Sequence, residues 1–106
     1  MKELKDFLHV VNNDGFVEGH EVLEDVWKIW KKIPEKRDES FILKGLINGS
    51  TAIALKVRKK DEQALRVWAT YLKYEPLIDE IDSEFSSMYR QASELLVQKS
   101  IEYKIN

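Results

Sequence analysis

Apolar residues recur every three or four positions along this chain, which is the spacing of amphipathic α-helices. No stretch alternates between apolar and polar residues as a half-buried strand would, and only four glycines and two prolines interrupt the pattern. The periodicity and its breaks predict five helices, at about residues 2–12, 16–33, 41–60, 61–74 and 83–103. We therefore expect an all-α protein, a compact bundle of about five helices in a single domain over residues 1–106.

The segment 16–33 has the clearest two-sided pattern. At 100° per residue its apolar side chains share one arc, which includes Ile29 and two tryptophans, and most of its charges lie opposite. The charges change from acidic near the start to basic near the end, as the helix dipole favours. Pro34 is expected to stop this helix, because proline disfavours helical geometry in the residue before it.

The segment 41–60 is predicted to be the central helix, capped at its start by Asp38 or Ser40. A broad apolar face is flanked by a strip of small residues, which are Gly45, Gly49 and Ala52. Glycine inside a helix costs about 1 kcal/mol, so this strip predicts the close approach of another helix.

The segment 61–74 is predicted to bury four large side chains, which are Leu65, Trp68, Tyr71 and Leu72. A short connection containing Pro76 leads to the last helix. Because all connections are short, neighbouring helices should pack roughly antiparallel.

Composition narrows the classes of function. The chain has no cysteine, which excludes disulfides and thiolate chemistry, and it shows no Gly-rich phosphate loop, so we expect no cofactor. A formal charge of −2 and a pI near 5.7 do not suggest nucleic acid as a partner. No targeting segment is visible, and the longest weakly charged run, 41–55, is shorter than the ~20 residues that cross a bilayer. We expect a cytoplasmic protein without a membrane partner.

One polar cluster deserves a chemical interpretation. His20 and Glu24 are four residues apart, so they lie side by side on one helix face, and Trp27 is one turn further along. A carboxylate beside a histidine can fix its tautomer or hold it as a general base. The pair is more simply explained as a structural seam at the edge of the apolar arc.

A metal site is not expected. The stretch His-Glu-Val-Leu-Glu begins like the zinc-protease pattern HExxH, but Glu24 stands where the second histidine would be needed. The other histidine, His9, is predicted to be exposed on the first helix. One histidine and one glutamate supply at most two ligands.

Four stretches of the sequence resemble the family known as domain of unknown function 309. They are NNDGFVEGHEVLEDVW (12–27), ILKGLIN (42–48), QALRVW (63–68) and YEPLIDEID (74–82). The family pattern places His20, Glu24 and Trp27 at its own histidine, glutamate and tryptophan. The resemblance implies a small all-helical bundle of about five helices, with no established biochemical activity.

Several positions depart from the family pattern. The family usually has glutamine at the positions of Lys44 and Asn48, and it often has a histidine near Ala54 or Leu55. It also has Gly-Asn where this chain has Lys60 and Asp61. A mechanism that needs a second histidine is therefore not available here.

Two functions follow as hypotheses. The first is a non-catalytic module that binds an unknown protein or small ligand through His20, Glu24, Trp27, Lys44 and Asn48. The second is a hydrolase-like acid–base enzyme, in which Glu24 orients His20 as the base and Lys44 or Asn48 stabilises developing charge. A homodimer is a further possibility, since two-fold dimers are the commonest oligomers.

Overall fold

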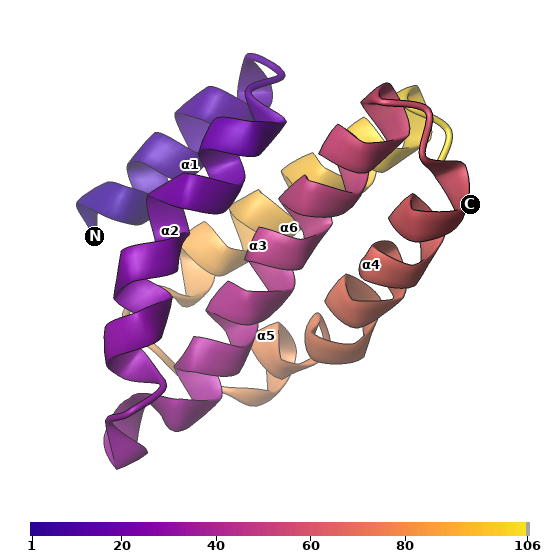
Figure 1. Ribbon diagram of the computed structural model, residues 1–106. Helices are drawn as coiled ribbons and strands as arrows, with labels where there is room; N and C mark the ends of the chain where they lie inside the picture. Colours follow the sequence, from indigo (N-terminus) through magenta and orange to yellow (C-terminus); the bar gives the residue numbers. More distant parts are fainter. Residues whose placement is uncertain (106) are drawn as a thin grey trace.

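Five long helices joined by short turns make up the computed structural model of the protein, which describes residues 1–105 (Figure 1). In chain order the elements are α1 (Lys2–Asn12), α2 (Phe16–Trp30), the 3-10 turn η1 (Pro34–Lys36), α3 (Arg37–Val57), α4 (Asp61–Tyr74), the short helix α5 (Leu77–Glu80) and α6 (Ser86–Glu102). These residues contain no strand. The predicted all-α bundle is confirmed, and α5 is a single turn within the predicted connection.

Helix α3 occupies the centre of the molecule, as the sequence predicted. It lies between α2 and α4 in a row of three helices, and α1 and α6 lie behind this row in the view of Figure 1. Ten of its 21 residues are buried, more than in any other helix of residues 1–105. The apolar core therefore forms around α3, mainly from side chains of α1, α2, α3, α4 and α6.

The small residues of α3 allow neighbouring helices to approach closely. A Cβ added at Gly49 would lie 2.8 Å from Leu96 Cδ1 and 3.2 Å from Tyr71 Cδ1. A Cβ added at Gly45 would lie 3.1 Å from Tyr74 Cβ. Gly49 therefore meets both α4 and α6, and the predicted close packing at this strip is confirmed.

Helix boundaries differ from the predictions around Pro34. Helix α2 ends at Trp30, three residues earlier than expected, and Ile33 is extended with φ −103° and ψ 114°. The pyrrolidine ring excludes helical geometry from the residue before it, so the chain unwinds over a turn. Pro34 then starts η1, which runs directly into α3. Asp38 and Ser40 consequently lie inside α3, so the prediction that one of them caps this helix is wrong.

Helix α3 also ends earlier than predicted, at Val57. Lys59 adopts a left-handed conformation with φ 60°, and the Lys60 amide donates to the Leu55 carbonyl over 3.0 Å. This bond and the one from the Lys59 amide to the Lys56 carbonyl form a Schellman motif, which closes a helix end.

Some of the apolar side chains that the periodicity assigned to the core face solvent instead. Leu65 and Leu72 of α4 are 45% and 52% exposed, and Ile29 of α2 is 61% exposed. Trp68 and Tyr71 are buried as predicted. Because α4 packs mainly against α3, only a narrow stripe of its surface is covered.

No helix within residues 1–105 has the length and apolar character needed to cross a bilayer.

Replacing Gly49 with alanine should destabilise the protein. Alanine is a better helix former by about 1 kcal/mol, but overpacking between Leu96 and Tyr71 costs about 1–3 kcal/mol. We expect Gly49→Ala to melt several degrees below the wild type in a circular-dichroism scan, while Ser87→Ala on the exposed face of α6 melts near it. A melting temperature above that of the wild type would contradict the close approach at Gly49.

Candidate functional site

The predicted site residues of α2 form a stripe along one side of the helix. His20, Glu24 and Trp27 follow each other at intervals of four and three residues, and Lys31 continues the stripe. His20, Glu24 and Trp27 are half-buried. The stripe thus lies at the edge of the core, where a side chain is both held by packing and accessible.

Two pockets bring residues of α2 and α3 together. His20 shares a small pocket of about 120 Å³ with Thr51 and Leu55. Trp27 shares a cleft of about 230 Å³ with Lys44. The two helices are joined by a short connection and run in opposite directions (Figure 1).

Of the five predicted residues, His20 lines the first pocket and Trp27 and Lys44 line the second, whereas Glu24 and Asn48 line neither. We call the surface of α2 and α3 that carries both pockets the α2–α3 groove.

Polar groups in the α2–α3 groove are bonded within their own helices. The His20 Nε2 and Glu24 Oε2 atoms are 3.9 Å apart, and Glu24 Oε1 lies 3.1 Å from Lys28 Nζ. The Asn48 side-chain amide donates to the Lys44 carbonyl over 2.7 Å. Within residues 1–105, none of the five residues donates or accepts a side-chain hydrogen bond between α2 and α3. The cluster therefore does not join the two helices through polar contacts.

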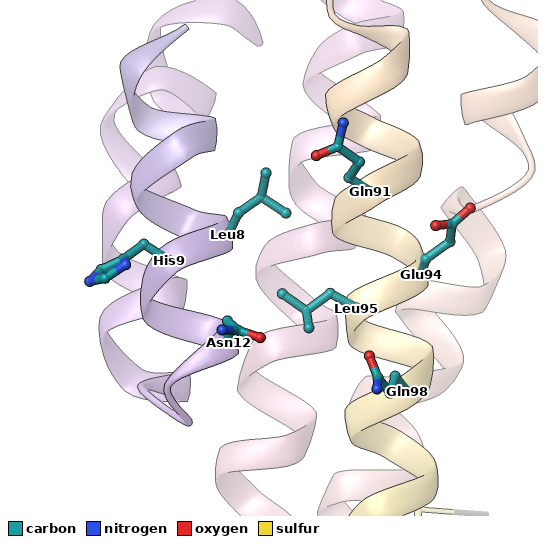
Figure 2. Close-up of a pocket in the computed structure, with 7 residues that line it drawn as sticks. All are labelled: Leu8, His9, Asn12, Gln91, Glu94, Leu95 and Gln98. Carbon is teal, nitrogen blue, oxygen red and sulfur yellow. The ribbon is translucent and has the colours of Figure 1, made fainter.

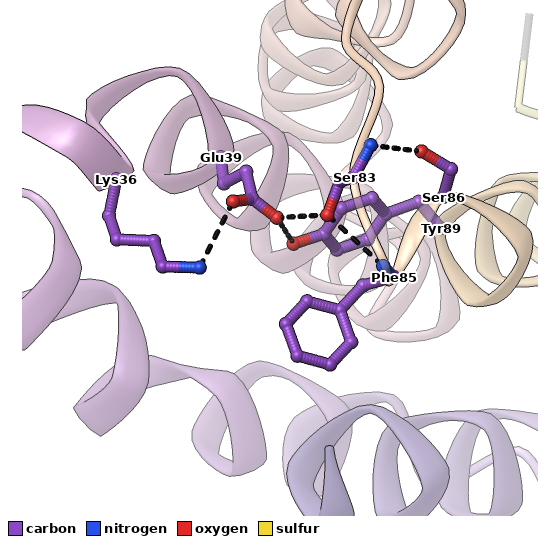
Figure 3. Close-up of polar contacts among 6 residues, drawn as sticks. All are labelled: Lys36, Glu39, Ser83, Phe85, Ser86 and Tyr89. Atoms are coloured by element: carbon purple, nitrogen blue, oxygen red, sulfur yellow. Dashed lines mark hydrogen bonds and ion pairs between the residues drawn. The ribbon is translucent and has the colours of Figure 1, made fainter.

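Other polar side chains do join helices, and the cluster around Glu39 is the clearest example (Figure 3). The Glu39 Oε1 atom accepts hydrogen bonds from Ser83 Oγ over 2.5 Å and from Tyr89 OH over 2.8 Å. Its Oε2 atom lies 3.2 Å from Lys36 Nζ. The Ser83 hydroxyl also accepts a hydrogen bond from the Phe85 amide, which forms a turn at residues 83–85. Helix α6 therefore starts at Ser86 rather than at Ser83, where it was predicted to start.

The environment of the Glu39 cluster changes two pKa values. Burial raises the pKa of Glu39, but the hydrogen bonds from Ser83, Tyr89 and Lys36 outweigh it, so the pKa lies below its ordinary value. Burial and the Glu39 carboxylate both raise the pKa of Tyr89 well above its usual range. The carboxylate is therefore held ionised and the phenol protonated, which suits a fixed structural contact.

A long-range ion pair fixes the turn between α1 and α2. The Lys99 Nζ atom of α6 lies 2.7 Å from Asp14 Oδ1, and Asp14 has a left-handed backbone with φ 64°. The hydrogen bond from Lys99 lowers the pKa of the Asp14 carboxyl group despite the opposing effect of burial. This contact ties the C-terminal helix to the turn that precedes α2.

A larger open groove of about 460 Å³ lies between α1 and α6 (Figure 2). Leu8 and Leu95 face each other across it, while Gln91 and Gln98 border it on α6 (Figure 2). The His9 imidazole points away from the α6 side chains and is exposed, as predicted. This groove therefore lacks a convergent set of chemical groups.

The chemistry that His20 can perform is restricted by its neighbours. Thr51, the hydroxyl residue of the same pocket, donates to the Ile47 carbonyl of its own helix over 2.9 Å. Ser50 Oγ is buried and donates to the Phe16 carbonyl over 2.6 Å. Across residues 1–105, no three histidine, aspartate or glutamate side chains are grouped to hold a metal ion. The hydroxyl groups nearest to His20 along α3 are therefore both engaged by backbone carbonyls.

Two residues that were not predicted from the sequence complete one end of the groove. Arg37 and Phe41 line the same cleft as Trp27 and Lys44, together with Lys31. The spacing of Arg37, Phe41 and Lys44 is i, i+4, i+7, which is a signal that could have placed them on one helix face. It was lost because α3 was predicted to begin at residue 41.

Comparison with known proteins gives one match. A family model described as a domain of unknown function (DUF309) matches residues 4–67, which is more than half of the chain. The match covers α1, α2, α3 and the first half of α4, and so includes the whole α2–α3 groove. No curated protein and no solved structure matches.

Substitutions at the His20–Glu24 pair should leave stability nearly unchanged. The two side chains are 40% and 34% exposed, and exposed ion pairs contribute about 0–1 kcal/mol. We expect His20→Ala and Glu24→Gln to melt within a few degrees of the wild type in circular dichroism. Ser50→Ala, which removes a buried hydrogen bond, should cost about 1–3 kcal/mol and serves as the sensitive control. If His20→Ala and Glu24→Gln lowered the free energy of unfolding by that much, the pair would have a structural role.

The contribution of Glu39 to stability should depend on pH. Because its pKa is lower in the folded state, its stabilisation is present above its ordinary value of 4.5 and is lost as pH falls through the folded value. We expect Glu39→Gln to lower the free energy of unfolding at pH 7, with the difference narrowing below about pH 4.5. Urea unfolding at several pH values measures this. The exposed Glu62→Gln variant should differ little from wild type, and a pH-independent deficit in Glu39→Gln would refute the assignment.

Proposed function

We propose that this chain, which belongs to the domain of unknown function 309 (DUF309) family, is a non-catalytic interaction module that holds a segment of a protein partner in the α2–α3 groove. The observation that supports the proposal is that His20, Trp27 and Lys44 line two pockets between α2 and α3. Half-buried side chains whose polar groups do not bridge helices are available to a ligand without disturbing the core.

The two ends of the groove offer different contacts. At the His20 end, Val17, Ala54 and Leu55 line the pocket of about 120 Å³, and Val17 is 51% exposed. A pocket of this size and apolar lining fits an aliphatic side chain of a partner. At the other end, the half-buried indole of Trp27 offers the kind of aromatic surface that dominates many protein interfaces.

Acid–base hydrolysis by His20 and Glu24 has less support. The nearby hydroxyl of Thr51 and the amide of Asn48 both donate to carbonyls of α3. The His20–Glu24 pair would supply only the base and the group that orients it. Hydrolysis also needs a nucleophile and a group that stabilises the developing negative charge.

Comparative affinity capture tests the proposal. Tagged wild-type protein, a His20→Ala/Trp27→Ala double variant and a His9→Ala control would be incubated in parallel with lysate of the source cell, and retained proteins would be quantified by mass spectrometry. We expect at least one protein to be retained by the wild type and the control and to be depleted at least tenfold with the double variant, because loss of an aromatic anchor weakens interfaces by about that much or more. His9 is the matched control because it is exposed on α1 and points away from α6.

The double variant must retain the wild-type circular-dichroism spectrum for the comparison to hold. Equal recovery of every retained protein by the wild type and the folded double variant would refute the groove as the docking site.

A further inference from the structure

The end of the α2–α3 groove near Trp27 combines aromatic rings with positive charge. Its cleft of about 230 Å³ is lined by Trp27, Lys31, Arg37, Ser40, Phe41 and Lys44, which we call the basic aromatic cleft. Three of these six side chains carry a positive charge and none carries a negative charge. The cleft is therefore much more basic than the chain as a whole, whose formal charge is −2.

Each cation of the cleft is positioned over an aromatic ring. Lys31 Nζ lies 4.3 Å from the centre of the Trp27 ring, and the Arg37 guanidinium lies 5.4 Å from the centre of the Phe41 ring. Contacts of this kind favour a cation at the face of the ring. They restrict the charged groups to the cleft without neutralising them.

The basic surface continues onto α4. The Phe41 and Tyr74 rings stack with a centroid distance of 5.4 Å and an interplanar angle of 4°. Lys44 Nζ lies 5.6 Å and Lys73 Nζ lies 5.2 Å from the centre of the Tyr74 ring. The stacked pair therefore carries a row of cations from α2 across α3 to α4.

These cations are not neutralised by acidic side chains of the protein. Within residues 1–105, Lys31, Arg37 and Lys44 take part in no ion pair, whereas Lys36, Lys56 and Lys99 do. Glu24, the carboxylate of the groove, lies 3.1 Å from Lys28. A ligand that brings negative charge would meet cations already in place, which gives specificity and faster association.

Each of the three cations lies over a different ring, so each offers a separate positive charge to a carboxylate. A nucleic acid would need a larger continuous basic surface, and the net charge of this chain is negative.

We propose that the basic aromatic cleft binds an acidic segment of the protein partner, with its aspartate or glutamate carboxylates pairing with Lys31, Arg37 and Lys44. This inference rests on the proposed function of the α2–α3 groove and names the chemistry of its partner. Apolar side chains of the same segment contact Trp27 and Phe41 between the ion pairs.

Fluorescence anisotropy with a synthetic peptide tests this inference. The probe is a fluorescein-labelled 12-residue peptide in which aspartate and glutamate alternate with leucine, and the comparison peptide has asparagine and glutamine in their place. We expect the acidic peptide to bind the wild type, and we expect this binding to weaken steeply as the salt concentration is raised. Its affinity for the variant Lys31→Gln/Arg37→Gln/Lys44→Gln should be lower by about tenfold or more.

A matched variant controls for net charge. Lys2→Gln/Lys5→Gln/Lys60→Gln removes three exposed positive charges outside the cleft and should bind the acidic peptide nearly as the wild type does. The inference is overturned if the acidic peptide fails to bind the wild type, if both triple variants weaken it equally, or if a 12-nucleotide single-stranded DNA binds more tightly.

Affinity capture with the same triple variant separates this inference from the proposed function. A partner that is lost with His20→Ala/Trp27→Ala but retained by the cleft variant would leave the groove as the docking site and refute the acidic chemistry. A partner retained by both variants would refute the proposed function itself.

Discussion

The close packing of α3 against its neighbours is the constraint on which the rest of the structure depends. Gly49 has no room for a Cβ because Leu96 and Tyr71 occupy the space, and Gly45 is similarly covered by Tyr74. A Cβ added at Gly19 of α2 would lie 2.7 Å from Ser50 Oγ on α3. These close approaches hold α2, α3 and α4 in one row, with α1 and α6 against one side of it (Figure 1). In Figure 1 no helix of residues 1–105 covers the other side of the row.

Polar side chains divide into two groups according to what they contact. Glu39, Tyr89, Lys99 and Asp14 make contacts between distant parts of the chain, and the pKa of each is shifted on balance in the direction that preserves those contacts. His20, Glu24 and Asn48 bond only within their own helices over residues 1–105. A buried polar group stabilises a fold only when it is paired, so the first group is accounted for by the fold. The contacts of the second group do not connect separate helices.

The groove combines an apolar pocket at the His20 end with cations over aromatic rings at the Trp27 end. Such a surface suits a segment that is apolar in one part and acidic in another. Pre-positioned cations reduce the conformational entropy lost on binding, since the lysine and arginine side chains are already restrained by the rings beneath them. The DUF309 family match spans both helices of this groove.

The sequence by itself determined the five long helices, the central position of α3, the small-residue strip and the stripe of His20, Glu24 and Trp27, because each depends on spacing within one helix. Only the tertiary structure decided which apolar residues are covered. Leu65 and Leu72 follow the same apolar spacing as the buried residues of α4, but α3 does not cover them. It also decided that Glu39 meets Ser83, 44 residues away, and that Arg37 and Phe41 join Trp27 and Lys44 in one cleft. Helical periodicity fixes the direction in which a side chain points around the axis of its helix. The distance and angle at which a second helix packs against that helix decide what the side chain finally contacts.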